Sequence, residues 1–310
     1  MLTIDLVQLN VWLDYIFVTL YIVVLLGLSA HFVGNLIAGR LKKRFIKWEW
    51  PHHEGPPIPF LPRFLHFQHV ASMIVLVISG LYIRFPGFLV GELANARTYM
   101  RWAHYIAMII VVINLVWRLW YAFMSARRDY REFVITRKDI TTMPQVILYY
   151  IFVKSSKPHL DKYNVMQKAT YTLFVPLLII QAFTGFALVT TPLIADTSPR
   201  DWLVGWWLGA ALGSTDLAGW YMRIVHYIVN WLFIILTTVH VYLSVSEDFP
   251  AFLNFFGLSF LDRTHATHGD GDHGETHAHP GGDEDDHAGT HHKDHEAGSG
   301  RRQKYMPWST

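Results

Sequence analysis

Five apolar runs dominate the 310-residue sequence, and each is long enough to cross a lipid bilayer as a helix. They lie at about 11–38, 64–86, 101–124, 168–194 and 220–246. Only 16% of the residues are charged and 52% are hydrophobic, which is far too apolar for a soluble domain of this length. The sequence therefore predicts an all-α fold, a polytopic membrane helix bundle.

The connecting segments predict how this bundle is oriented. Residues 39–63 and 125–168 are rich in lysine and arginine, whereas 87–100 and 195–219 contain one arginine each. Because basic loops stay on the cytoplasmic side, we expect a multi-pass protein of the cell inner membrane with a periplasmic N-terminus and a cytoplasmic C-terminus. The N-terminal residues lack the basic region and cleavage site of a signal peptide, so we expect the first run to remain a membrane helix.

Four histidines inside the apolar runs fall at two depths. His226 and His240 share the last run, and their spacing corresponds to about 21 Å along a helix and to nearly the same face. The predicted orientation brings His104 to the depth of His226, and His66 to the depth of His240. Ionisable side chains inside a membrane are costly, and two matched pairs of imidazoles are typical of axial ligands to two haem groups. Hydrogen bonding between helices is the alternative.

Other residues near these depths leave more than one interpretation open. His69 follows His66 by three residues on a neighbouring part of the same surface, so either could reach a haem. We interpret His69 as a neighbour of a haem propionate or quinone, or as a packed polar residue. We interpret His31 as structural. Gly80 and Gly185 fit the close approach of a flat macrocycle, or of another helix.

An arginine lies three residues before each of three histidines in the apolar runs. A guanidinium group can pair with a haem propionate, and we predict this role for Arg63, Arg101 and Arg223. Snorkelling to the membrane interface is the alternative.

The connection at 125–167 is long, and its segment MPQVILYYIFVK is apolar but too short to span. We expect it to form an amphipathic helix on the cytoplasmic surface. A polar cluster follows at the start of the fourth run. We predict quinone contacts for Asn164, Gln167 and Lys168, with a capped helix start as the alternative.

From Asp262 onward the composition changes. Nine of the eighteen histidines lie between 265 and 295, mixed with acidic residues and glycine, and such a segment should be disordered. It is a candidate for loose binding of a divalent metal, or a solvated tail without that role. The metal candidates are His265, His268, His273, His277 and His279.

The sequence contains no cysteine, which excludes iron–sulfur clusters and covalently attached haem. Electrons would therefore travel on non-covalent cofactors and come from another protein.

Several motifs together resemble one known family, the di-haem cytochrome b subunits of nickel–iron hydrogenases and the related gamma subunits of formate dehydrogenases. The resemblance covers about 60–258. It is carried by Arg63-Phe-Leu-His66-Phe67, Ser79-Gly80, Met100-Arg101-Trp102-Ala103-His104, Arg223-Ile-Val-His226 and the segment from His240 to Asp248. The segment from Lys162 to Lys168 is similar to the formate dehydrogenase version, whereas Phe67 stands where the family usually has tryptophan.

The resemblance implies two haem b groups, ligated by the pairs His66/His240 and His104/His226, with Asn164 near the quinone. We predict an extra N-terminal transmembrane helix at 1–39, a cytoplasmic basic loop at 40–63, a four-helix di-haem domain at 64–258 and a disordered tail at 259–310.

The function implied is that of a membrane-anchoring subunit in a respiratory, quinone-reducing hydrogenase complex. It would receive electrons from the iron–sulfur (small) subunit of a periplasmic nickel–iron hydrogenase, assembled with the large subunit, and pass them to menaquinone or ubiquinone. With both axial positions filled by histidine, neither iron would activate hydrogen or oxygen, so quinone reduction is the one reaction the chain would itself catalyse. Nothing indicates nucleic-acid binding. The alternatives are a formate dehydrogenase gamma subunit and, from another class, a haem-free metal transporter with the histidines as its pathway.

Overall fold

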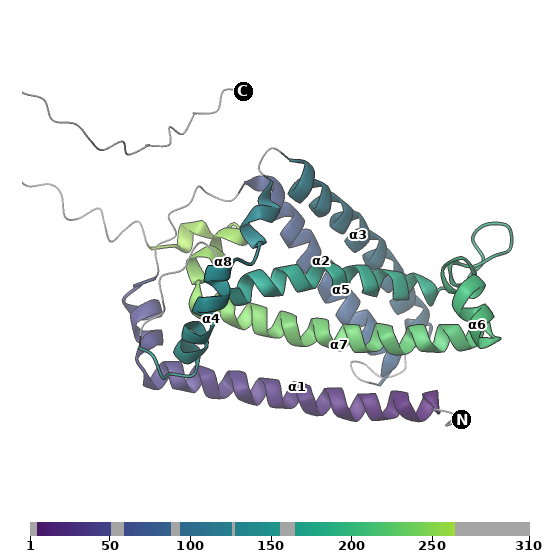
Figure 1. The fold of residues 1–310 in the computed structure, drawn as a ribbon, viewed down its shortest axis with the longest axis horizontal. Coiled ribbons are helices and arrows are strands. Elements are labelled where there is room, and N and C mark those ends of the chain that lie inside the picture. The colour runs from purple at the N-terminus through teal and green to yellow at the C-terminus, as the bar shows by residue number, and fades with distance from the viewer. Residues whose placement is uncertain (1–4, 51–58, 88–93, 126–127, 156–164, 264–310) are drawn as a thin grey trace, which may run out of the picture. The chain divides into compact units, whose positions relative to one another are not determined.

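The computed structural model describes residues 5–50, 59–87, 94–125, 128–155 and 165–263. Helices form throughout, and all five predicted spanning segments are helical (Figure 1). These helices are α1 (Leu6–Ile37), α2 (Phe60–Arg84), α3 (Ala96–Met124), α5 (Val165–Ala187) and α7 (Thr215–Glu247). Each contains a stretch long and apolar enough to cross a bilayer, so the prediction of an all-α polytopic bundle is confirmed.

The shorter elements lie between and after these helices. They are the π-helical segments η1 (Lys42–Ile46) and η3 (Asp201–Gly209), the 3₁₀ segments η2 (Asp129–Phe133) and η4 (Ser259–Leu261), and the helices α4 (Arg137–Tyr150), α6 (Ala210–Leu212) and α8 (Phe249–Phe255). The helix expected over MPQVILYYIFVK is present as α4, but it begins and ends earlier. A capping box in which Thr136 and Asp139 exchange side-chain and backbone hydrogen bonds fixes its start.

The fourth spanning segment is shorter than predicted, because α5 ends at Ala187 and not near residue 194. The chain turns back here, and Arg200 holds the turn: its Nε donates to the Ala187 carbonyl at 3.3 Å, and its backbone N–H donates to Val189 at 3.2 Å. These bonds satisfy carbonyl groups that would otherwise be left unpaired at the helix end.

The four helices α2, α3, α5 and α7 form the bundle core, in which α2 packs along α3 and α5 packs along α7. A buried apolar cluster of Leu177, Val229 and Phe233 joins α5 to α7, with Met73 of α2 against it. We call the end of the bundle at which α7 begins the α6 end, and the end at which α7 finishes the α8 end (Figure 1).

Helix α1 lies along α7, outside this core (Figure 1). Near the α6 end, Asp14 pairs with Arg84 and accepts a hydrogen bond from Tyr227. Farther along, Tyr21 bonds to Thr238 at 3.2 Å. Polar side chains in a membrane helix are costly unless they are paired, so these contacts fix α1 against α7 and the end of α2.

Candidate functional site

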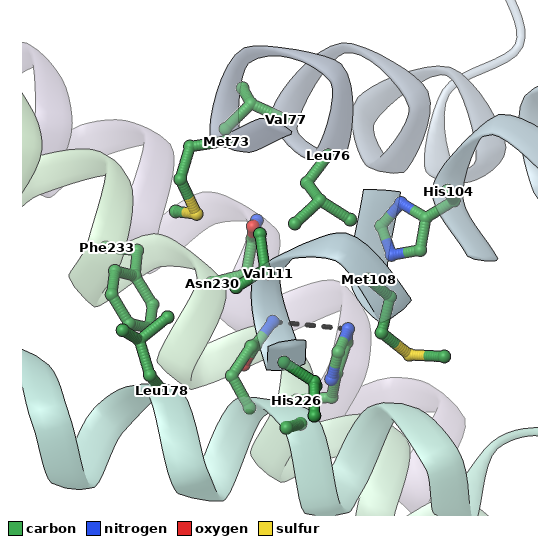
Figure 2. Close-up of a pocket in the computed structure, with 13 residues that line it drawn as sticks. Met73, Leu76, Val77, His104, Met108, Val111, Leu178, His226, Asn230 and Phe233 are labelled. Carbon is green, nitrogen blue, oxygen red and sulfur yellow. Dashed lines mark hydrogen bonds between the residues drawn. The ribbon is translucent and has the colours of Figure 1, made fainter. Parts of the chain in front are cut away.

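Two histidines from different helices face each other toward the α6 end of the core. His104 lies near the start of α3 and His226 lies in α7, and their ring centroids are 6.4 Å apart. Figure 2 shows both imidazoles beside one cavity whose walls are largely apolar. The cavity is lined by Met73, Leu76, Val77, His104, Met108, Val111, Val112, Leu178, Gln181, Ala182, His226, Asn230 and Phe233.

A hydroxyl group of α2 sets the orientation of His104. Ser79 Oγ is 2.9 Å from His104 Nδ1 and donates its own hydrogen to the Val75 carbonyl at 2.6 Å. Because that hydrogen is used, the hydroxyl oxygen accepts a hydrogen bond from Nδ1–H. The neutral imidazole of His104 therefore has its lone pair on Nε2, the atom through which an imidazole can bind a metal.

The same arrangement recurs for His226 with a hydroxyl of α5. Thr184 Oγ1 is 3.0 Å from His226 Nδ1 and donates its hydrogen to the Ile180 carbonyl at 2.8 Å. His226 Nδ1 is thus the donor and Nε2 has the lone pair. The Gln181 amide nitrogen lies 3.2 Å from Nε2 and donates to it, as the dashed line in Figure 2 shows.

A glycine next to each hydroxyl residue makes room for the ring that the hydroxyl holds. A Cβ atom on Gly80 would lie 3.4 Å from Cε1 of His104. A Cβ atom on Gly185 would lie 3.3 Å from Cε1 of His226 and 3.3 Å from the sulfur of Met108. The contacts at Gly185 are tighter than ordinary van der Waals packing, so a larger residue at this position would push against the imidazole of His226.

These features fit a metal held between two imidazoles. Two metal–nitrogen bonds of about 2 Å, one to each ring, correspond to ring centroids about 6 Å apart. Each imidazole donates its Nδ1–H to a neighbouring hydroxyl, as metal-binding histidines almost always do with their other ring N–H. The apolar cavity walls fit a large flat group such as haem, so the residues present fit the predicted cofactor.

His66 and His240 belong to the second predicted pair, toward the α8 end. His66 in α2 is near enough to interact electrostatically with His240 in α7 and with Arg118 of α3. The ring of His66 is 4.9 Å from that of Phe255 in α8, and the ring of His240 is 6.4 Å from that of Phe174. Aromatic side chains thus surround this pair, and the ligand roles of all four histidines stay predictions.

The three arginines predicted to contact haem propionates differ in how exposed they are. Arg63 is partly buried with no hydrogen-bond partner for Nε among the described residues, whereas Arg101 and Arg223 are exposed. Arg223 lies over the ring of Trp220, with 4.6 Å from its Cζ to the ring centroid. Their propionate contacts remain predictions.

The predicted quinone contacts are only partly within the described chain. Lys168 is buried and its Nζ lies 2.9 Å from Asp139 of α4, so its charge is already paired. Asn164 lies outside the described residues, and the side chain of Gln167 is not described. His69 interacts electrostatically with His66 and Arg118.

The tail candidates His265, His268, His273, His277 and His279 also lie outside the described residues. Within the described part of the chain, no three histidine or acidic side chains gather into a metal-binding cluster.

The fold and this site define a class, a membrane helix bundle with histidines paired inside it as haem ligands would be. Comparison with known proteins identifies the family: residues 58–256 match the prokaryotic cytochrome b561 family, and the chain belongs to it. It is therefore a multi-pass membrane cytochrome of the b type. The match, at 58–256, agrees with the range of about 60–258 over which the sequence resembles the family, and it leaves out α1.

Individual relatives agree with this family. The chain is 28% identical over 193 residues to a probable Ni/Fe-hydrogenase B-type cytochrome subunit of Azotobacter vinelandii, covering 60% of this chain and 78% of the relative. It is 24% identical over 194 residues to a protein of the same name from Rhodobacter capsulatus, covering 60% and 72%. It is 25% identical over 194 residues to the probable Ni/Fe-hydrogenase 1 B-type cytochrome subunit of Escherichia coli K12, covering 60% and 80%.

Sequence reasoning singled out the two glycines but not the hydroxyl groups of Ser79 and Thr184, nor Gln181. The available signal was the same dipeptide, a hydroxyl residue followed by glycine, in the second and fourth apolar runs. Such a repeat inside two membrane helices indicates equivalent tasks.

Proposed function

We propose that this chain is the membrane-anchoring cytochrome b subunit of a nickel–iron hydrogenase complex, and that it holds two haem b groups and passes electrons to a quinone. The observation that carries the proposal is the pair His104 and His226, each with Nδ1–H bonded to a hydroxyl of a neighbouring helix and with the lone pair on Nε2, the atom that can bind a metal. The names of the relatives support the hydrogenase partner over the formate dehydrogenase alternative.

Haem b, when bound, supplies reversible one-electron transfer. The residues of the chain position the imidazoles, fix their tautomers and exclude water. His104 and His226 would ligate at the α6 end, and His66 and His240 at the α8 end. The apolar walls around the first pair, with Phe233 and Met108 among them, keep the site dry and favour a cofactor that needs no bulk solvent.

The proposed orientation puts the α8 end on the cytoplasmic side of the inner membrane. Helix α4 and segment η1 lie at this end and carry basic residues, including Lys42, Lys43 and Lys138, as cytoplasmic segments do. The α6 end would then face the periplasm and the iron–sulfur subunit of the hydrogenase. Electrons would enter near His104 and His226 and leave near His66 and His240.

Haem binding is tested on the protein purified from membranes in mild detergent. The pyridine haemochrome assay should give two haem b per chain, and a low-temperature reduced-minus-oxidised spectrum should resolve two α-bands. A chain without haem, or with bound zinc or nickel in its place, would contradict the proposal and favour the transporter alternative.

The absence of cysteine makes the orientation directly testable. Asp196 is exposed in the loop after α5, and Lys43 is exposed in η1. The two test variants are Asp196→Cys and Lys43→Cys. A maleimide that cannot cross membranes should label the first variant in intact spheroplasts and the second only after permeabilisation. The reverse pattern would invert the topology.

The partner is tested by affinity purification from native membranes, followed by mass spectrometry. Recovery of hydrogenase large and small subunits supports the proposal, and recovery of a formate dehydrogenase in their place would select the alternative.

A further inference from the structure

A second cavity lies outside the four-helix core, between α1, the end of α4 and α7. Its volume is about 630 Å³, which is within the range of small-molecule binding sites. Its walls are almost entirely apolar. Helix α1 supplies one wall, and α1 lies outside the region that matches the family. The lining residues that matter below are Gly27, His31, Phe152, Val239 and Tyr242.

His31 is a polar side chain that lines this cavity. Its Nδ1 lies 2.6 Å from the hydroxyl of Tyr242 and 3.1 Å from the amide nitrogen of Asn35. Because the amide nitrogen is a donor, Nδ1 has the lone pair and the proton of the neutral imidazole is on Nε2. That Nε2 atom is buried and has no hydrogen-bond partner among the described residues. A buried donor without an acceptor is costly, and a ligand with a carbonyl oxygen would relieve the cost.

The aromatic surroundings indicate the shape of such a ligand. The ring of His31 is 5.3 Å from that of Phe152, 5.6 Å from that of Tyr242 and 5.9 Å from that of Tyr150. Gly27 has open space where a side chain would be. A flat, apolar ring with a carbonyl on its edge matches both the walls and the Nε2–H donor of His31.

The cavity is also close to the inner histidine pair. Val239 and Tyr242 face the cavity, and His240 lies between them in sequence. At about 100° per residue, the His240 ring leaves α7 on a neighbouring face, and a helix is only about 10 Å across. A ligand beside His31 would therefore lie within one helix width of His240.

We propose that this cavity binds the ring of a quinone, with one quinone carbonyl accepting a hydrogen bond from His31 Nε2–H. This proposal rests on the proposed function, in which the chain delivers the electrons that reduce the quinone. Conversion of a quinone to its quinol takes up two electrons, delivered along the chain, and two protons from water at the α8 end, one for each carbonyl oxygen. The site is separate from the predicted contacts at Asn164, Gln167 and Lys168, of which Lys168 is already paired with Asp139.

The test uses the purified holoprotein in lipid nanodiscs and a photoreactive azidoquinone as the probe. Labelled peptides are identified by mass spectrometry, and ubiquinone-1 is the competitor. Labelling is expected on the peptides that contain His31 and Phe152, and excess ubiquinone-1 should abolish it. Gly27→Leu fills the cavity and His31→Phe removes the donor, and each should reduce this labelling at least about tenfold.

Ser29→Leu is the matched control, because Ser29 is exposed on the same helix and does not line the cavity. Its labelling should equal that of the wild type, and haem content should be unchanged in all three variants. Labelling that persists in Gly27→Leu, or that falls on residues 165–171 instead, would overturn this site and leave quinone reduction intact. Phospholipid as the sole occupant, with no specific labelling anywhere, would overturn the site and count against the quinone as acceptor.

Discussion

The two ends of the core hold their histidine pairs in different ways. At the α6 end, helices of the core hold the pair. Each of α2 and α5 provides a hydroxyl that accepts a hydrogen bond from an imidazole, and a glycine that makes room for the ring. At the α8 end, His66 lies against Phe255 of α8, outside the four helices. The first site is built by hydrogen bonds between helices of the core, and the second includes packing against an accessory segment, α8.

Buried charges join η1 and α4 to the core at the same end. Arg44 of η1 bonds to Glu247 at 2.8 Å and to the Tyr149 hydroxyl at 2.7 Å, which connects η1, α7 and α4. Lys168 and Asp139 join α5 to α4 in the same way. We therefore predict that removing the hydroxyl of Ser79 or Thr184 weakens haem binding only at the α6 end. Removing one member of a buried ion pair should weaken haem binding mainly at the α8 end.

The largest effect is expected from replacing a ligand. His226→Ala removes one of the two imidazoles at the α6 end, so the haem content should fall from two per chain to one, as measured by pyridine haemochrome. His240→Ala should remove the other haem and leave the α-band that His226→Ala abolishes. Two single variants that lose the same band, or both bands in a folded protein, would break the assignment of pairs.

The next largest effect is expected from Arg44→Met. The side chains of Arg44 and Glu247 are 9% and 5% exposed, and breaking a buried ion pair on one side costs about 3–5 kcal/mol. On heating in detergent, the α8-end haem should be lost at lower temperature than in the wild type, with the α6-end haem much less affected. Arg44→Met combined with Glu247→Met should recover most of the loss, because no unpaired charge remains. A double variant as unstable as the single one would mean that the charge pair is not the cause.

A smaller and strictly local effect is expected from Thr184→Val. The variant keeps the shape of the side chain but removes the acceptor for His226 Nδ1–H, and loss of such a partner typically lowers metal affinity about 10–100-fold. Transfer of haem to apomyoglobin should be faster from the α6 end only, and Ser79→Ala should behave alike. Thr238→Val is the control, because that hydroxyl is in the same helix as His226 but bonds to the Ile234 carbonyl and to Tyr21. Equal haem release from Thr184→Val and Thr238→Val would mean that the hydroxyl does not position His226.

The same contrast explains what the sequence could predict. Helix length and apolar composition are local properties, so the five spans and the relative depth of each histidine could be predicted from the order of residues. The end of α5 at Ala187 could not be predicted, because the side chain of Arg200, thirteen positions later, satisfies the carbonyl of Ala187. The role of Thr184 depends on a contact with His226 across 42 positions of sequence, and that of His31 depends on a cavity formed by three separate segments. The sequence favours a structural role for His31, because the only histidines at its depth are His66 and His240, which already form a pair.

The smallest effect is expected from acid, at the α8 end. The Thr136 backbone N–H donates to Asp139 at 2.8 Å, and with Lys168 beside it the pKa of this carboxyl is lowered to about 2. A lowered pKa means that the ionised carboxylate stabilises the fold above the ordinary value near 4, and that this contribution is lost as the pH falls through about 2. Between about pH 4 and pH 2, α4 should therefore loosen from α5, seen as faster pepsin cleavage in the α4 segment. Asp139→Asn should remove this pH dependence and leave cleavage at the α6 end unchanged. If the wild type and Asp139→Asn are cleaved with the same pH profile, the ion pair with Lys168 does not hold α4 in place, and the α8 end depends on Arg44 and its partners alone.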